Sequence, residues 1–353
     1  MGKTFLCINF GCRVNAAETN QFAQKLISDG YTPLLSSKEG PGVDLIFINT
    51  CSVTAKANIE SLGKIRSLRH QYPNAKIVVS GCADLRNIEV LPNISIINNV
   101  EKEKILEKIN GAYRPQIGDK FSHTHRYILK VQSGCTHNCS YCTVPQKRPY
   151  LWSLPITTAI DTVNQAIKNG YQEIIISGVN LDQYKYGFST LIESLLKNTS
   201  VPLISFGSIP LNCIDSRFLS LMTDYRLQIT NFLHIPLQSG SDKILKLMHR
   251  PYNVKKIKEI FTSLKNITPR PVKGGAGGGF SFGTDIIVGF PGETDAEFEE
   301  TYNLCKLIGF SKIHVFRFSH RPNTLITDYY KSCLKPSKVD IKSRAEKLRK
   351  LST

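Results

Sequence analysis

The sequence predicts an α/β protein with an N-terminal open parallel sheet followed by a partial (β/α)6 barrel of the TIM type. Two observations support this class: short apolar runs alternate with stretches of helical periodicity, and helix-length spacers separate the runs. A chain of 353 residues is long enough for two domains with separate cores. We expect these domains at 1–115 and 122–334, followed by a basic tail at 335–353.

The first series of apolar runs predicts the N-terminal sheet. Its strands are expected at 3–10, 44–50, 76–81 and 94–99. Helical patterns lie between them, for example at 16–29 and 57–71. This alternation is typical of an open parallel α/β sheet. The polar segment 110–126 contains Gly and Pro and is the predicted linker.

A second series of β/α units predicts the barrel. Six strands are expected at 127–132, 173–178, 203–208, 232–237, 280–289 and 312–319. The helices between them are expected at 156–169, 191–197, 242–248, 254–265 and 296–307. The letters TDAE at 294–297 predict a capping box. The glycine-rich run at 273–279 lacks the Lys-Ser/Thr of a phosphate loop, which favours a flexible insertion.

Composition narrows the function classes. The net charge of +17 favours a polyanionic partner such as nucleic acid, although a merely solvated basic surface would give the same number. No apolar run approaches the roughly 20 residues of a membrane span, and the N-terminus does not resemble a secretory signal. We therefore expect a cytoplasmic protein. The ten cysteines are then expected to be reduced, and clustered ones to bind metal or take part in catalysis.

Three cysteines in SGCTHNCSYC, namely Cys135, Cys139 and Cys142, follow the first predicted barrel strand. Barrel enzymes build their active sites at this end of the strands. Thiolates select zinc or iron–sulfur clusters, and no second ligand pair follows at zinc-finger spacing. His137 lies too close in sequence to be an easy fourth ligand. Three thiolates therefore favour a [4Fe–4S] cluster with one open iron, against the alternative of three cysteines packed as small apolar residues.

A second trio, Cys12, Cys51 and Cys82, is widely spaced in the sequence. Each member comes just after a predicted strand of the first sheet. Because the carboxyl ends of parallel strands form one edge, all three thiolates can converge there. This geometry predicts a second three-cysteine cluster, while a buried cysteine after a strand remains the alternative.

The first-strand motif CxxxCxxC resembles the radical S-adenosylmethionine superfamily, with Tyr141 at its aromatic position before the third cysteine, where the resemblance implies a contact with the cofactor. The resemblance implies that the open iron chelates S-adenosylmethionine and cleaves it to a 5′-deoxyadenosyl radical. Together with GCRVN, NTCSVT and SGC around the first trio, the chain resembles the radical methylthiotransferases. The likeness continues through SGVNLDQY, HIPLQSGSDKILKLMHRPYN, GTDIIVGFPGETDAEFEET and HVFRFSHRPNT.

This resemblance implies two [4Fe–4S] clusters and S-adenosylmethionine as cofactors. The barrel cluster would generate the radical, and the cluster on Cys12, Cys51 and Cys82 would deliver sulfur. Gln238 and Ser239, at the end of the fourth barrel strand, are implied S-adenosylmethionine contacts, with purely structural roles as the alternative. The implied partners are tRNA, an electron donor and a sulfur source, and we expect a monomer without membrane contact.

The residues around the first trio favour one branch of the family. GCRVNAAET and CSVTAKA resemble the branch that acts on threonylcarbamoyladenosine in tRNA, where Gly-Cys-Lys/Arg-Val-Asn is usual. The isopentenyladenosine branch has Gln-Met after its cysteine, and the ribosomal-protein branch has Pro-Lys. The implied reaction replaces C2–H of the modified adenine beside the anticodon with a methylthio group. Alternatives are isopentenyladenosine, a ribosomal-protein aspartate, or an inactive iron–sulfur protein that binds tRNA.

Some positions depart from the family pattern or remain outside it. The chain stops at Thr353, where the family's RNA-binding TRAM domain would begin, so RNA contacts are expected to rest on the basic surface and tail. Arg148 matches a family arginine, but Pro149 replaces the glycine after it. The remaining cysteines are expected to lie in the core or to have no specific role: Cys7, Cys213, Cys305 and Cys333. The histidines near the motif are expected in solvated loops: His123, His125 and His137.

Overall fold

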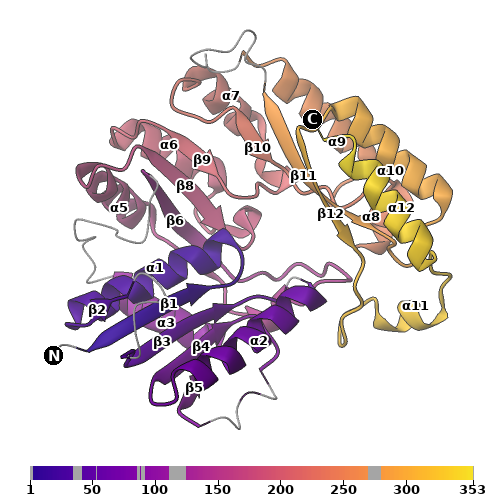
Figure 1. Ribbon diagram of the computed structural model, residues 1–353. Helices are drawn as coiled ribbons and strands as arrows, with labels where there is room; N and C mark the ends of the chain where they lie inside the picture. The colour runs from indigo at the N-terminus through magenta and orange to yellow at the C-terminus, as the bar shows by residue number, and fades with distance from the viewer. Residues whose placement is uncertain are drawn as a thin grey trace. The chain divides into compact units, whose positions relative to one another are not determined.

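The computed structural model describes residues 3–34, 42–52, 54–85, 88, 92–110, 125–268 and 280–352. The linker core at 111–124, His123 and the glycine-rich run at 273–279 lie outside these residues. The chain forms two compact units, which are described separately (Figure 1). The first comprises Met1–Cys135 with Gln146–Val179, and the second comprises Thr136–Pro145 with Asn180–Thr353.

The first unit contains a five-stranded sheet in the order β2-β1-β3-β4-β5, and every pair in it is parallel. Its strands are β1 (Thr4–Asn9), β2 (Thr32–Pro33), β3 (Leu45–Thr50), β4 (Lys76–Gly81) and β5 (Ile94–Ile96). Its helices are α1 (Arg13–Ser28), α2 (Ala55–Gln71) and α3 (Asn99–Asn110). The predicted open parallel sheet is confirmed. The predicted strand at 94–99 is too long, because Asn99 already begins α3.

The central strand β3 begins with four apolar residues, at 45–48, because both of its faces are covered. Successive side chains of a strand point to opposite faces, and both faces of this sheet are covered. Phe47 stacks on Phe22 of α1 with ring centroids 4.3 Å apart. Ile46 and Ile48 point the other way, into a buried cluster that includes Leu68 of α2. Strand β3 is thereby fixed between α1 and α2.

The first unit continues into the predicted barrel series. It includes β6 (Arg126–Ser133), β7 (Trp152–Ser153), α5 (Ile156–Lys168) and β8 (Glu173–Gly178). Strand β6 pairs in parallel with β8 and antiparallel with β7. Helix α1 contacts β6 and β8 as well as β1 and β3. The N-terminal sheet and the first β/α repeat therefore share the helix α1.

The second unit carries the remaining β/α repeats. Its strands are β9 (Ile204–Phe206), β10 (Phe232–His234), β11 (Ser281–Val288) and β12 (Lys312–Arg317). Its helices are η1 (Leu181–Gln183), α6 (Phe188–Asn198), η2 (Leu211–Cys213), α7 (Ser216–Asp224), α8 (Asp242–Leu247), α9 (Val254–Lys265), α10 (Asp295–Ile308), α11 (Thr327–Ser332) and α12 (Lys338–Arg349). The chain returns from the second unit to the first within the short helix α4 (Val144–Lys147). Strands β10, β11 and β12 form a parallel sheet, as predicted.

Helix α10 begins with the predicted capping box. The Glu297 carboxylate accepts a hydrogen bond from the backbone N–H of Thr294 at 2.8 Å, and it also contacts the Thr294 hydroxyl. Lys243 donates to the same carboxylate at 2.8 Å. These donors lower the pKa of Glu297 to about 2, the Lys243 hydrogen bond being the largest cause. The carboxylate is thus ionised at neutral pH beside the positive end of the helix dipole.

The basic tail folds into α12 and packs on the second unit. Ala345 and Leu348 are buried, and α12 contacts β11, β12 and α10 (Figure 1). The guanidinium of Arg344 pairs with Glu293 at 2.7 Å and Asp295 at 2.8 Å. The Arg344 side chain therefore attaches α12 to the start of α10 and is not free to bind an RNA phosphate. None of the described helices is long and apolar enough to cross a bilayer.

Candidate metal-cluster sites

The first cysteine trio lies at the carboxyl edge of the five-stranded sheet. Cys12 follows β1 and caps α1, Cys51 follows β3 and Cys82 follows β4. The backbone N–H of Cys82 donates to the carbonyl of Thr50 at 3.1 Å, which joins the second and third loops. Parallel strands in this order therefore bring the three loops to one place, as their positions after the strands predicted.

Gly11 shows how closely the first two loops approach. A Cβ atom at this position would lie 3.3 Å from the Sγ atom of Cys51 and 3.0 Å from its Cβ atom. The backbone also has φ of +141°, which favours glycine. Glycine is required before Cys12 because any larger residue would push the Cys51 loop away.

Two asparagines lie beside these thiols. The Oδ1 atom of Asn15 is 3.8 Å from the Sγ atom of Cys12. The Nδ2 atom of Asn99 is 3.8 Å from the Sγ atom of Cys82, and it donates to the carbonyl of Lys147 at 2.8 Å. Asn99 therefore connects the Cys82 loop to the segment that follows the CxxxCxxC motif.

Arg148, which follows Lys147 in the chain, also contacts the surroundings of the first trio. Its guanidinium donates to Asn15 Oδ1 at 2.7 Å and to both oxygens of Glu18 at 2.7 and 3.0 Å. Its backbone carbonyl accepts a hydrogen bond from the N–H of Cys135 at 3.3 Å. Arg148 therefore contacts the surroundings of the first trio with its side chain and the first residue of the second trio with its backbone.

Glu18 is the centre of a fully buried group of charges. Lys102 lies 2.7 Å and Lys130 lies 2.9 Å from its carboxylate, in addition to Arg148. Lys130 also pairs with Glu103 at 2.6 Å. None of these five side chains is more than 4% exposed. We call this set the buried charge cluster.

The buried charge cluster has an excess of positive charge, because three cations meet two carboxylates. Burial opposes the ionisation of Glu18, but Arg148, Lys102 and Lys130 together hold its pKa well below the usual range. Burial likewise opposes the charge on Arg148, yet Glu18 and the nearby Cys82 and Cys12 raise its pKa. The excess cation therefore favours an anionic group at this edge, which fits thiolates bound to an iron–sulfur cluster.

The CxxxCxxC loop begins where β6 ends. Cys135 follows Gly134, whose φ is +82° and whose position leaves no room for a Cβ atom beside the Tyr150 carbonyl. Farther along the loop, the N–H of Cys142 donates to the Cys139 carbonyl at 3.0 Å. The N–H of Val144 points to the Sγ atom of Cys142 at 3.4 Å. This turn therefore gives the third thiol a hydrogen-bond donor of the kind that stabilises thiolates.

Arg250 is a site residue that the sequence did not reveal. Its guanidinium donates to the Sγ atom of Cys139 at 3.3 Å and to the hydroxyl of Tyr252 at 2.9 Å. It lies in MHRPYN, a segment that resembles the family, and arginine is not itself a metal ligand, so only this resemblance could have drawn attention to it. Arg250 therefore places a cationic hydrogen-bond donor directly beside the Sγ atom of Cys139.

The three residues expected to contact S-adenosylmethionine occupy different environments. Tyr141 packs edge-on against Phe290 with centroids 6.1 Å apart, and burial raises its pKa. Gln238 has φ of +71° and exchanges backbone hydrogen bonds with β11 through Asp285 and Ile287. Ser239 is completely buried, with its hydroxyl 3.2 Å from that of Thr301. Ser239 therefore contacts α10 through Thr301, and Gln238 lies at a constrained turn.

His137 is not the solvated loop residue that its position suggested. Its Nε2 atom lies 3.5 Å from Asp182 Oδ2, and its Nδ1 atom lies 3.3 Å from Asn180 Nδ2. Asp182 is partly buried, and this burial raises its pKa. Asn180 and Asp182 belong to SGVNLDQY, whose first two residues end β8. Their position just after a strand is the feature of the sequence that could have identified them as partners of His137. His125 is exposed, as expected.

The other cysteines agree with the expectation of core or incidental roles. All ten cysteines lie in the described residues, and none forms a disulfide. Cys213 and Cys305 are buried. Burial raises the pKa of Cys7 and of Cys305 to about 12, so these thiols stay protonated. Cys333 lies at the end of α11, away from any ligand motif.

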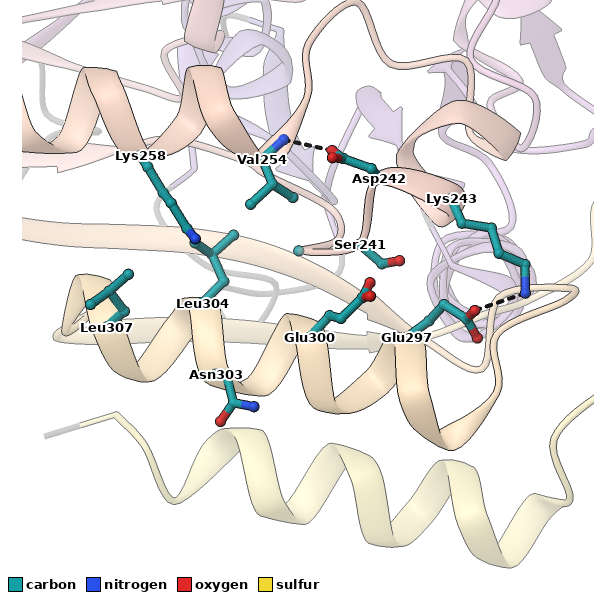
Figure 2. A pocket seen from close by; sticks show the side chains of 11 residues that line it. Ser241, Asp242, Lys243, Val254, Lys258, Glu297, Glu300, Asn303, Leu304 and Leu307 are labelled. Atoms are coloured by element: carbon teal, nitrogen blue, oxygen red, sulfur yellow. Dashed lines mark hydrogen bonds and ion pairs between the residues drawn. The ribbon is translucent and has the colours of Figure 1, made fainter.

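A separate cavity of about 480 Å³ lies between α8, α9 and α10 (Figure 2). Asp242 accepts a hydrogen bond from the N–H of Val254 at 2.7 Å on its wall, and Lys243 pairs with Glu297. Lys258 and Glu300 also line it. None of the residues that line the cavity is a cluster cysteine, so it is separate from the candidate metal sites.

Comparison with known proteins places the chain in a family. The sequence matches the radical SAM superfamily over residues 129–305 and "Uncharacterized protein family UPF0004" over residues 4–101. It is 34% identical over 332 residues to the threonylcarbamoyladenosine tRNA methylthiotransferase of Chlamydia pneumoniae, covering 91% of this chain and 76% of that protein. It is 29% identical to the tRNA-2-methylthio-N(6)-dimethylallyladenosine synthase of Thermodesulfovibrio yellowstonii, covering 92% and 78%.

A solved structure supports the fold. The radical S-adenosylmethionine methyltransferase TsrM from Kitasatospora setae superposes with a TM-score of 0.67 at 12% identity, over 92% of this chain and 77% of that one. This likeness confirms the predicted fold class, with parallel α/β sheets and a radical SAM fold. Sequence and fold agree with the resemblance inferred from the cysteine motifs. The chain belongs to the radical S-adenosylmethionine methylthiotransferases.

Proposed function

We propose that this methylthiotransferase acts on C2 of N6-threonylcarbamoyladenosine in tRNA. The observation that carries the proposal is the sequence around the first trio, GCRVNAAET and CSVTAKA, together with relatives of that name in Chlamydia pneumoniae and, at 33% identity, Thermotoga maritima. The C2–H bond of adenine carries no acidic proton, so acid–base catalysis alone cannot replace it. Radical chemistry suits this substitution.

The two trios would hold the clusters. Cys135, Cys139 and Cys142 would bind a [4Fe–4S] cluster that, with S-adenosylmethionine, supplies the radical. Cys12, Cys51 and Cys82 would bind a second cluster that supplies the sulfur. The excess positive charge next to Cys12 and Cys82 fits this assignment, because it compensates an anionic cluster.

The chain's own side chains would orient these ligands. Arg148 and Asn99 hold the segment after the CxxxCxxC motif against the surroundings of Cys12 and Cys82. Arg250 would hold the Cys139 side chain in place through the hydrogen bond to its Sγ atom. Such outer contacts matter because they fix ligand direction and tune the potential of a cluster. Tyr141, Gln238 and Ser239 remain our candidates for S-adenosylmethionine contacts.

Partners follow from the proposed reaction. The net charge of +17 would attract the tRNA backbone, and binding would weaken steeply with salt. The exposed cations of α12 would contribute, while Arg344 would not. An electron donor and a sulfur source are also required. We propose a cytoplasmic monomer with a sulfur-delivery domain at 1–115, a radical domain at 122–334 and the tail at 335–353.

Mass spectrometry of tRNA nucleosides tests the substrate. The chain is expressed in a bacterial host that lacks its own threonylcarbamoyladenosine methylthiotransferase, and tRNA is digested. We expect a methylthio mass gain on threonylcarbamoyladenosine, and none when Cys135 is replaced by alanine. A gain on dimethylallyladenosine instead would contradict the proposed substrate, and would match the second group of relatives.

A further inference from the structure

His234, Asp285 and His314 come together on one face of the second unit's sheet. In the parallel register, His234 is opposite Gly283, and Asp285 is opposite His314. Because Gly283 and Asp285 are two residues apart on β11, both point to the same face. All three side chains therefore share the face opposite to Phe282, which packs against Phe261 of α9 with ring centroids 5.1 Å apart.

The distances within this trio suit a single metal ion. The Nε2 atom of His234 is 3.0 Å and the Nδ1 atom of His314 is 3.2 Å from the same oxygen, Oδ1 of Asp285. All three candidate ligand atoms lie within 4.8 Å of one another. Ligand atoms at about 2.0–2.2 Å from a tetrahedral ion are separated by roughly 3.3–3.6 Å, so each imidazole nitrogen is already close to the distance from Asp285 Oδ1 that coordination requires.

The charge and exposure of the surroundings would allow a cation to reach the trio. No Lys or Arg of the described residues lies within ion-pair distance of Asp285, whose carboxylate pairs with the two imidazoles. Gly283 is needed beside them, since a Cβ atom there would lie 2.6 Å from Nδ1 of His234. The His314 side chain is 44% exposed, which provides a path for entry from solvent.

We propose that His234, Asp285 and His314 bind one divalent transition-metal ion of the zinc class, separately from both cysteine trios. Two imidazoles and one carboxylate are a ligand set found in zinc enzymes that keep a coordination position open. The fourth position would take water or an oxygen or nitrogen group of a ligand. The alternative is a hydrogen-bonded trio, in which each imidazole donates one proton to Asp285 and no metal is held.

Metal analysis of the reconstituted holoenzyme tests the site. The full chain, loaded with iron and sulfide without oxygen, is incubated with zinc and desalted, and zinc and iron are counted. We expect one zinc per chain beyond the iron, and an affinity at least about 100-fold weaker in His234→Ala and His314→Ala, with unchanged iron. His70→Ala, an exposed histidine of α2, serves as the control and should keep its zinc.

X-ray absorption at the zinc edge of the wild-type protein identifies the ligands without relying on any variant. The proposal predicts only nitrogen and oxygen neighbours at about 2.0–2.2 Å. A sulfur shell near 2.3 Å would assign the zinc to a cysteine trio and overturn the proposal. Less than one-tenth of an equivalent of zinc in the wild type would overturn it too, and would leave the hydrogen-bonded trio.

Discussion

Replacing Glu18 by glutamine is expected to lower the free energy of unfolding by about 3–5 kcal/mol. Glutamine keeps the shape but removes the charge that Arg148, Lys102 and Lys130 surround at 2.7–2.9 Å. Glu103 alone would then face three buried cations. Urea unfolding of the cluster-free chain measures the change, followed by the fluorescence of Trp152. This residue is the single tryptophan of the chain, and Lys130 lies over its ring at 5.2 Å.

A matched control is Glu193→Gln. Glu193 also pairs with two cations, Lys197 and Arg217, but at the surface, where ion pairs contribute little. Its unfolding midpoint should therefore remain close to that of the wild type. Equal midpoints for Glu18→Gln and Glu193→Gln would show that the buried charge cluster does not hold the first unit together.

Replacing Cys12, Cys51 and Cys82 together by alanine is expected to reduce methylthio product to background while leaving S-adenosylmethionine cleavage intact. The reason is that this trio would hold only the sulfur-delivering cluster, and Cys135, Cys139 and Cys142 would still hold the other. The two readouts are methylthio nucleoside and 5′-deoxyadenosine, both measured by mass spectrometry after adding reductant and S-adenosylmethionine.

Cys7→Ala is the control for this triple variant. Cys7 lies on β1 of the same sheet, but burial raises its pKa to about 12 and it is no candidate ligand. Both products should form in this variant at wild-type levels. If the triple variant still made methylthio nucleoside, the first trio would be structural. If it lost 5′-deoxyadenosine as well, the division of roles between the trios would be wrong.

The approach of the three loops that carry the first trio could be predicted because it follows from topology alone. Cys12, Cys51 and Cys82 each come after a strand, and parallel strands end at one edge. The capping box at Thr294 was equally local, since four consecutive residues contain it. The start of α3 was missed because Asn99 follows an apolar run closely, and strand and helix patterns overlap there.

The buried charge cluster could not be predicted in the same way. Lys102 and Glu103 lie in NVEKEKILEKIN, which has the composition of a solvated helix. Their burial is decided by partners far away in the chain: Arg148 is 130 residues from Glu18, and Lys130 is 112 residues from it. No periodicity within one segment contains that information. The sequence drew attention to Arg148 only because it matches an arginine of the family, and it did not predict which carboxylate this arginine would pair with.

The iron and acid-labile sulfide content per chain shows whether the protein holds two clusters or one. The wild-type protein is reconstituted without oxygen and desalted, and both elements are counted alongside Mössbauer spectra. Two [4Fe–4S] clusters predict about eight iron atoms per chain, all in cubane form. About four iron atoms per chain, unchanged when Cys12, Cys51 and Cys82 are replaced, would contradict the account, because the first trio would then hold no cluster.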